Sequence, residues 1–425
     1  MISLKNIHQT LKQNPLPVVL LTIFVDMLGY GILIPIVPQL LGDENSIFSV
    51  LSPGMSIDEG YILLGFLVGI YPFMQFFATP ILGQLSDKFG RKKILAIALT
   101  GTCLSYVAFA IGVITRNIPL LFLARGFDGI TGGNISVAQA AIADVSTPLT
   151  RARNFGFIGA TFGLGLVIGP YLGGKLSDPS LVSWFTPATP FWFAAGLSFI
   201  NVMSVIFLFP ETLEKLRRVN GIQWFQSVKN IIAAFKLKSL RIPFFASFIF
   251  QAGFSFFITF FSVFLIRKFG FTQGNIGDFF AYAGIWIVFG QVFVNSTISK
   301  RFKEHTILKF ALIGMATCIA LFFAPKTGWG LLFISPFFAI CFGLVQANFL
   351  SLISRSVGPD EQGRTLGVNS SINTLGQSLP PILSGYIAAL LTPNAPLMIS
   401  AVAIFMAGLI FVLLYKPPLS TAKAA

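Results

Sequence analysis

The sequence predicts an all-α integral membrane protein, with twelve transmembrane helices in two pseudo-symmetric six-helix bundles. Its composition is the first reason: 55% of the 425 residues are hydrophobic and 10% are charged, against about a quarter charged in a soluble protein. The second is that apolar residues gather in windows of about 20, enough for a helix to cross a hydrocarbon core of roughly 30 Å. The third is an internal duplication.

Twelve apolar windows follow one another along the chain. They lie at residues 16–41, 61–82, 94–114, 118–143, 155–174, 190–209, 242–266, 276–298, 306–324, 328–352, 365–391 and 395–415. The first is too long for the apolar core of a signal peptide and has no small-residue cleavage site after it, so we count it as a span. The loops are short, and we expect no soluble domain between spans.

Basic residues are distributed unevenly between the two sides of the membrane. With the amino terminus placed inside, cytoplasmic segments hold 23 of the 29 Lys and Arg residues and external segments hold five. This bias predicts that both termini are cytoplasmic, with the external Arg267–Lys268 pair as a local exception. The net charge of +14 therefore indicates topology and contact with anionic lipid, not a nucleic-acid partner.

The duplication divides the chain into two halves. Five residues recur 211 positions later: Arg153, Gly156, Gly165, Pro170 and Gly174 correspond to Arg364, Gly367, Gly376, Pro381 and Gly385. We expect amino-terminal and carboxy-terminal bundles at residues 1–209 and 242–425, joined by a cytoplasmic linker at 210–241. Its stretch 222–238 is amphipathic, and we expect a short helix on the membrane surface there.

Span 5 is rich in small residues at helical spacing. They are Gly156, Gly165, Gly169, Pro170, Gly173 and Gly174. Small residues four apart let a neighbouring helix approach closely. The Gly-Pro pair interrupts the helical hydrogen-bond ladder and predicts a bend.

The loop between spans 2 and 3 carries the string Gly-Gln-Leu-Ser-Asp-Lys-Phe-Gly-Arg-Lys-Lys at 83–93. Within it, Gly90 suits a turn that needs positive φ. The corresponding loop of the second half, 296–304, has Lys300 in place of the aspartate and Glu304 in place of the arginine. We expect that second loop to be mainly structural.

Three charged residues lie deep inside spans: Asp26 in span 1, and Arg125 and Asp128 in span 4. Charge within a membrane helix is costly, so it must face a cavity or a partner. A carboxyl group that moves between an apolar cavity and a neighbouring Arg takes up and releases a proton. We predict that Asp26 and Asp128 carry the proton and that Arg125 tunes them. The alternatives are a static Arg125–Asp128 ion pair, and an Asp26 hydrogen bond that braces the proline kinks of span 1.

Substrate-binding residues are the least constrained prediction. The candidates combine aromatic rings with a few polar groups: Tyr30, Gln251, Phe254, Phe257, Trp286 and Gln346. Such a lining suits planar, amphipathic organic molecules. The alternative for the span 7 phenylalanines is packing or lipid contact. No deeply placed charge occurs in the second-half spans, which argues against a strongly anionic substrate.

The 83–93 loop, the Arg125-x-x-x-Gly129 string of span 4, the span 5 pattern and the 354–364 stretch resemble the major facilitator superfamily. Within it they are similar to the twelve-span drug/proton antiporters of the tetracycline-exporter-like branch. The resemblance implies that the span 5 pattern is an antiporter motif. It also implies a cytoplasmic gate formed by Gly83, Asp87, Gly90, Arg91 and Asp144. In this gate Asp87 lies near the amino end of span 11 and Arg91 pairs with Asp144.

These observations predict proton-coupled efflux of small hydrophobic or amphipathic compounds by alternating access, in a bacterial inner membrane. The alternative is a proton-linked or facilitative carrier of a metabolite or siderophore. A non-transporting scaffold or sensor is poorly supported, because charges inside spans are costly without a function. We expect no enzyme activity, no metal site and no cofactor other than the proton gradient. The expected partners are a small-molecule substrate, protons and the lipid bilayer, and we expect a monomer by analogy.

Overall fold

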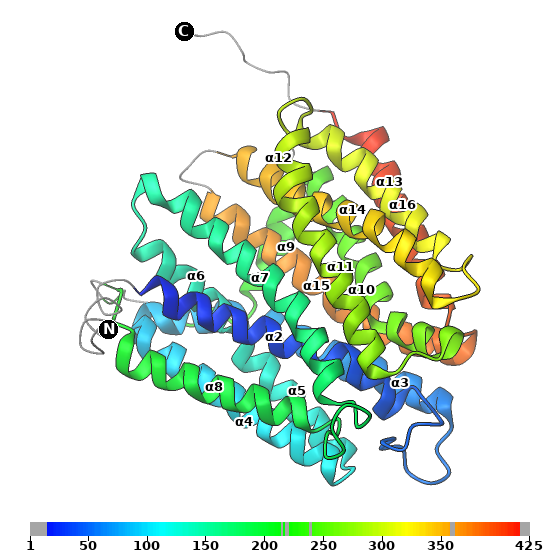
Figure 1. Ribbon diagram of the computed structural model, residues 1–425. Helices are drawn as coiled ribbons and strands as arrows, with labels where there is room; N and C mark the ends of the chain where they lie inside the picture. The colour runs from blue at the N-terminus through cyan, green and yellow to red at the C-terminus, as the bar shows by residue number, and fades with distance from the viewer. Residues whose placement is uncertain (1–14, 214–215, 217–220, 238–239, 358–361, 417–425) are drawn as a thin grey trace, which may run out of the picture.

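The computed structural model describes residues 15–213, 216, 221–237, 240–357 and 362–416, and all regular secondary structure among them is helical (Figure 1). The first bundle contains α2 (Leu16–Leu41), α3 (Ile57–Phe89), α4 (Arg91–Ile114), α5 (Ile118–Thr131), α6 (Ile135–Asp144), α7 (Pro148–Leu176) and α8 (Thr189–Leu208). A 3₁₀ turn, Gly132–Asn134, joins α5 to α6. These two helices therefore make one interrupted span.

The second bundle repeats this arrangement. It contains α10 (Arg241–Phe269), α11 (Gln273–Phe289), a π-helical segment (Gly290–Val294), α12 (Asn295–Ile298), α13 (Glu304–Leu321), α14 (Gly328–Arg355), α15 (Gln362–Leu390) and α16 (Ala395–Leu414). The short helix α9 (Gln226–Lys236) lies between the bundles in the sequence, inside the predicted surface stretch. The predicted domain boundaries themselves stay predictions.

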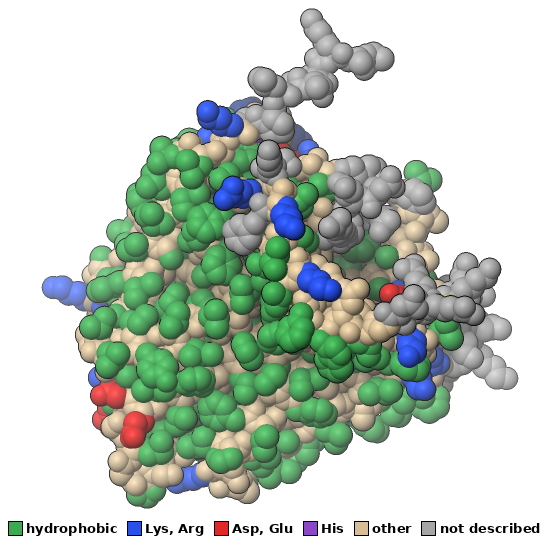
Figure 2. All heavy atoms as spheres, turned by 180° about the vertical axis from the view of Figure 1, so that it is seen from behind, with side chains coloured by type: hydrophobic (Ala, Val, Ile, Leu, Met, Phe, Trp, Pro, Cys, Tyr) green, Lys and Arg blue, Asp and Glu red, His purple; other side chains and the backbone are tan. Residues whose placement is uncertain are grey.

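Among the residues that the structure describes, ten helices are long and apolar enough to cross a membrane. The two other predicted windows are also helical. The window 118–143 contains the 3₁₀ turn, which divides it into two short helices. The window 365–391 lies in α15, which is 29 residues long but carries a polar first half. The apolar faces of the spans cover much of the surface in Figure 2, which is the surface that lipid would contact.

The core of the second bundle is built from phenylalanine. Phe257 of α10 is 2% exposed, and its ring centroid lies 4.4 Å from that of Phe261 and 4.9 Å from that of Phe338 on α14. Offset and edge-on aromatic pairs of this kind add to the burial of their apolar area. Much of the aromatic content of α10 is therefore used for packing within the bundle.

The two bundles meet closely on one side of the membrane. We call the side that carries α9 and the α3–α4 turn the linker side, and the opposite side the far side. Toward the far side α3 packs on α15 and α7 packs on α11. The helices approach through glycines: a Cβ on Gly174 would lie 2.9 Å from the Cα of Gly277. Toward the linker side, a Cβ on Gly156 of α7 or Gly367 of α15 would meet no atom within 4 Å.

The glycine contact gives a first prediction. A Gly277→Val side chain would press on the backbone of α7, since its Cβ alone would lie 3.0 Å from the Tyr171 carbonyl oxygen. Overpacking of this kind costs about 1–3 kcal/mol, so we expect the far-side contact to open. Spin labels at Leu181 and Lys326, on the far side of either bundle, should show a longer distance distribution. The control is Gly196→Val on α8, where a Cβ meets no atom within 4 Å; an equal shift there would contradict the prediction.

Candidate functional site

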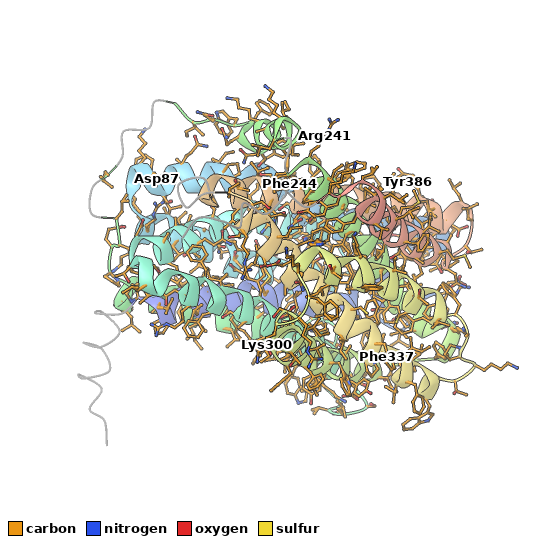
Figure 3. All side chains as sticks on the ribbon, turned by 90° about the horizontal axis from the view of Figure 1, so that it is seen from above. Asp87, Arg241, Phe244, Lys300, Phe337 and Tyr386 are labelled. Carbon is orange, nitrogen blue, oxygen red and sulfur yellow. The ribbon has the colours of Figure 1, made fainter. Side chains whose placement is uncertain are left out.

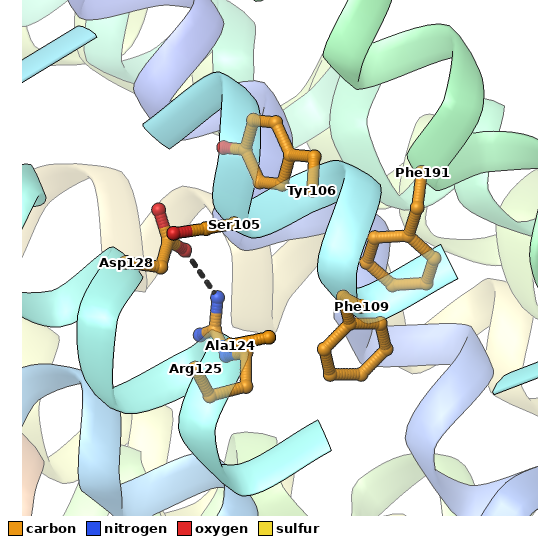
Figure 4. Close-up of a pocket in the computed structure, with 7 residues that line it drawn as sticks. All are labelled: Ser105, Tyr106, Phe109, Ala124, Arg125, Asp128 and Phe191. Atoms are coloured by element: carbon orange, nitrogen blue, oxygen red, sulfur yellow. Dashed lines mark hydrogen bonds and ion pairs between the residues drawn. The ribbon is translucent and has the colours of Figure 1, made fainter. Parts of the chain in front are cut away.

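Arg125 and Asp128 form a buried ion pair in the first bundle. The Arg125 Nη1 atom lies 2.7 Å from Asp128 Oδ2, and the two side chains are 3% and 5% exposed. The residues are three apart on α5, so they share one helix face. Figure 4 shows the pair beside a crevice whose other lining residues come from α4, α5 and α8. The crevice is too narrow to hold a water molecule, and the Arg125 Nε atom has no hydrogen-bond partner among the described residues.

Two tyrosines complete the surroundings of Arg125. The ring centroid of Tyr71, on α3, lies 4.5 Å from the guanidinium carbon, within the range of a cation–π contact. The ring of Tyr30, on α2, lies 5.9 Å from that of Tyr71. Sequence analysis did not select Tyr71, because an aromatic residue in a span gives no signal of its own.

Asp26 of α2 lies near Asp128 and beside Asn134. It is 3% exposed, and neither of its carboxyl oxygens makes a well-aligned hydrogen bond to any residue that the structure describes. Both amide atoms of Asn134 are likewise without a well-aligned partner. An isolated buried carboxylate is very costly. The charged form of Asp26 therefore has fewer stabilising contacts than that of Asp128, which is paired with Arg125.

The 3₁₀ turn between α5 and α6 places Asn134 in this site. The Gln75 amide on α3 donates to the Gly132 carbonyl oxygen at 2.9 Å and so fixes the turn. A Cβ on Gly133 would lie 2.9 Å from the carbonyl carbon of Ala78, so only glycine allows α3 to approach so closely. Sequence analysis overlooked Asn134 and Gln75, although a Gly-Gly-Asn sequence inside a span is a visible sign of an interrupted helix.

The small residues of span 5 pack against α2, the helix that carries Asp26. A Cβ on Gly165 would lie 3.1 Å from the Leu28 amide nitrogen, one on Gly169 would lie 2.6 Å from the Leu28 carbonyl oxygen, and one on Gly173 would lie 2.6 Å from the Ile32 carbonyl oxygen. Pro170 packs against Gly31 in the same seam. Gly174 faces α11, and Gly156 faces open space. α7 therefore joins the helix that carries Asp26 to the far-side contact between bundles.

Arg91 gathers the predicted gate residues on the linker side. Its Nη2 atom lies 2.7 Å from Asp87 Oδ1, and its Nε atom lies 3.0 Å from Asp144 Oδ2. Gly90 has φ of +97°, a value that favours glycine over other residues. A Cβ on Gly83 would lie 3.4 Å from Ser136 Oγ of α6. The labelled Asp87 lies at one end of the molecule in Figure 3.

Glu211, which sequence analysis did not select, supports this turn from the end of span 6. Its carboxylate accepts hydrogen bonds from the backbone N–H groups of Arg91 at 2.9 Å and Lys92 at 3.2 Å. These N–H groups open α4 and have no partner within the helix. An acid directly after the last apolar residue of a span was the signal available. The expected position of Asp87 near the start of span 11 stays a prediction, because residues 358–361 lie outside the described residues.

The second bundle contains the same linker-side pair with its charges exchanged. Arg91 is the first residue of α4 and Asp144 the last of α6; correspondingly, Glu304 begins α13 and Arg355 ends α14. Arg355 Nη1 lies 2.9 Å from Glu304 Oε1, and the Ser351 hydroxyl donates to the same oxygen at 3.1 Å. The second loop thus keeps a paired charge at this position although it lacks the residue types of the first.

Polar contacts join the bundles on the far side, among them a hydrogen bond from the Thr272 hydroxyl to Asp178 Oδ2 at 3.5 Å. Lys175 Nζ of α7 lies 2.8 Å from Asp278 Oδ2 of α11. Arg267, at the end of α10, donates a hydrogen bond to the Tyr61 hydroxyl of α3. These contacts give a structural reason for basic residues on the side that the charge bias leaves poor in them.

The predicted substrate residues lie in several places. Gln251 packs against Gly376 of α15, Phe254 stacks on Phe342 at 4.5 Å, and Phe257 belongs to the packed aromatic core. Trp286 of α11 contacts Phe289 at 5.6 Å. Tyr30 lies beside the first-bundle site, and Gln346 is half-buried on α14. No described pocket joins them, and their role stays a prediction.

Each bundle has a linker-side ion pair, and the charges of one pair are exchanged relative to the other. Together with the buried acid–arginine cluster and the contact of the two bundles on one side, these pairs indicate a membrane transport protein of the two-bundle type. The sequence profile of the Major Facilitator Superfamily matches residues 19–381, with a second match at 244–425. The chain belongs to the Major Facilitator Superfamily and, like its other members, is a transporter and not an enzyme.

Relatives of known name cover most of the chain. The tetracycline resistance protein, class H, of Pasteurella multocida is 31% identical over 380 residues, 87% of this chain and 88% of that protein. The quinolone resistance protein NorA of Staphylococcus aureus (strain COL) is 26% identical over 396 residues, 93% of this chain and 94% of that protein. The crystal structure of the D-xylose-proton symporter superposes with a TM-score of 0.76 at 16% identity, covering 94% of this chain and 97% of that one, and shows the fold alone.

The Arg125–Asp128 pair gives a second prediction. Asp128→Ala leaves a buried Arg without its counter-ion, which costs about 3–5 kcal/mol, so the purified protein should unfold at a clearly lower temperature. The double variant Arg125→Met, Asp128→Leu removes both charges and should recover much of that loss. Thermal unfolding in detergent measures both. A double variant no more stable than Asp128→Ala would mean that the pair does not account for the cost.

The Lys175–Asp278 contact gives a third prediction. Its side chains are 27% and 58% exposed, and an exposed pair contributes about 0–1 kcal/mol. Asp278→Asn should therefore shift the population toward a far-side-open state by up to about fivefold, read from the Leu181–Lys326 spin-label distance. The exchange Lys175→Asp, Asp278→Lys should reverse the shift. If the exchanged pair behaves like Asp278→Asn, the contact is not electrostatic.

Proposed function

We propose that the chain exports small hydrophobic or amphipathic compounds, such as drugs, in exchange for protons, by alternating access. The observation that carries the proposal is Asp26: a buried acid without a well-aligned partner, placed beside the Arg125–Asp128 pair. Relatives whose names state resistance to tetracycline and to quinolones support a drug-like substrate. The mechanism needs no cofactor beyond the proton gradient.

In the proposed cycle, Asp26 is the proton carrier and Asp128 holds Arg125 in place. Loss of the proton from Asp26 leaves a second carboxylate close to Asp128, with Arg125 as the nearby cation. Two acids that share one Arg repel each other, and the protein must rearrange or take up a proton. Because the seam between α2 and α7 continues to the contact with α11, a movement of α2 is transmitted to the far-side contact between bundles.

The orientation and the cellular location belong to the same proposal. The excess of Lys and Arg on the linker side supports a cytoplasmic linker side and cytoplasmic termini. The bacterial relatives support a bacterial inner membrane. By analogy with the superfamily, we propose a monomer as the working unit. The structure then has its bundles closed on the external side.

Asp26→Asn gives the fourth prediction. The amide has nearly the same shape but cannot release a proton, so substrate-driven proton movement should fall to the level of empty liposomes. The measurement uses proteoliposomes with an internal pH dye and a panel that includes tetracyclines, a fluoroquinolone and ethidium. The matched control is Asp43→Asn in the far-side loop, where the carboxylate only accepts from the nearby Asn45 N–H.

Each result of this experiment has a definite reading. Proton movement that one compound triggers, that Asp43→Asn keeps and that Asp26→Asn loses supports coupled export and identifies the ligand class. Coupled flux in Asp26→Asn would remove this residue from the mechanism. Binding of compounds without any proton movement in the unmodified protein would favour the facilitative carrier.

A further inference from the structure

The helix α9 has one face that attaches it to both bundles. The Ser227 hydroxyl donates to the Phe76 carbonyl oxygen of α3 at 2.5 Å, and the Asn230 amide donates to Ser371 Oγ of α15 at 3.2 Å. One turn further on, Ala234 packs into an apolar cluster with Phe244 and Val368. Positions 227 and 234 are buried and position 230 is half-buried, and their helical spacing places them in a single stripe.

A second stripe on α9 is apolar and uncovered. Phe225 is 65% exposed, Val228 is 37% exposed and Ile232 is 53% exposed; their spacing of three and four residues places them along one line. Trp224, in the turn before the helix, is 61% exposed. A helix that only connected two bundles through water would have no reason to show this stripe to solvent.

A third stripe, next to the apolar one, is basic. Lys229 and Lys236 are exposed and seven residues apart, so they lie almost in line. Within the part of the chain that the structure describes, no carboxylate lies within 4.0 Å of either amine; Lys229 only reaches the Gln223 side chain, at 3.3 Å. Figure 2, a view from the side on which α9 lies, shows blue basic side chains among green apolar ones.

We propose that α9 is a binding site for the headgroups of anionic phospholipids. A helix with an apolar stripe beside a basic one lies in the membrane interface, with its rings and aliphatic chains below the headgroups and its lysines among them. Trp224 fits this position, because tryptophan is enriched at the membrane–water interface. The lysines, which lack an acidic partner among the described residues, supply the charge that complements an anionic phosphate. The first stripe, formed by Ser227, Asn230 and Ala234, holds the helix at this position against both bundles.

The occupant is the membrane and not another protein, because the apolar stripe is part of the lipid-facing surface of the spans. The neighbouring helices expose apolar side chains as well, such as Phe245 on α10 and Leu379 on α15. The proposal depends on the placement of the chain in a bilayer and not on the transported compound. Its test therefore fails or succeeds independently of the proposed efflux.

The test uses Trp224 as the sole tryptophan, after replacement of the other four by phenylalanine: Trp184, Trp192, Trp286 and Trp329. The protein is reconstituted in bilayers of phosphatidylcholine with roughly 30% phosphatidylglycerol. Bromine, which quenches tryptophan fluorescence on contact, is carried either by the anionic lipid or by an equal amount of the neutral lipid. The two bilayers differ only in which lipid is brominated.

We expect the brominated anionic lipid to quench Trp224 more strongly than the brominated neutral lipid. A basic residue at an anionic surface is worth a factor of roughly five in local lipid enrichment, so Lys229→Gln, Lys236→Gln should remove most of the preference. The control Lys300→Gln, Lys303→Gln, which neutralises two exposed lysines in the second-bundle loop, should keep it.

Three results would overturn the proposal. Equal quenching by the two lipids in the protein that retains both lysines would mean that α9 contacts the bilayer without selecting anionic lipid. A preference that survives Lys229→Gln, Lys236→Gln would place the anionic site elsewhere. Absence of quenching by either lipid would mean that the apolar stripe is covered by water or by protein.

Discussion

The rest of the structure depends on one constraint: a charge inside the membrane must find its partner within the protein. Arg125 meets this constraint with Asp128 and the ring of Tyr71. The contacts require α3 and α5 to lie close together, which Gly133 and its neighbours in the span allow. The interrupted span and its 3₁₀ turn follow, since the helix must bend to bring Asn134 toward Asp26. The site is therefore built by packing around one cation.

A second consequence of close packing is that the site and the bundle contact share a helix. α7 has no charged residue between Phe155 and Leu172, yet its glycines lie directly on α2 behind Asp26, and Gly174 lies on α11. Side chains at these positions would separate the helices by more than the packing tolerates. A helix with small residues on two faces thus forms a mechanical connection between a buried acid and the far-side contact of the bundles.

Sequence reasoning reached the helices and the charged residues because both leave strong local signals. Apolar length identified the spans, and the cost of charge in lipid singled out Asp26, Arg125 and Asp128. It missed Tyr71, Asn134 and Glu211, whose importance lies in what they contact after folding. It named Phe257 as a candidate binding residue and packing as the alternative. The structure packs this ring in the aromatic core, and its role in binding stays a prediction. The exchanged pair Glu304–Arg355 was visible only as the absence of an expected residue.

In the proposed mechanism, the free energies involved are large enough for one proton to change which state is populated. The far-side contacts include a partly exposed ion pair, hydrogen bonds and close helix packing; the ion pair contributes about 0–1 kcal/mol. An unpaired carboxylate in a dry site costs several kcal/mol. Reversal of a two-state population from 1:99 to 99:1 needs about 5.5 kcal/mol. In the proposed mechanism, the charge on Asp26 is therefore of the right size to reverse the equilibrium. The exposed Lys175–Asp278 ion pair is weak enough to break during the cycle. It only biases which of the two states is populated.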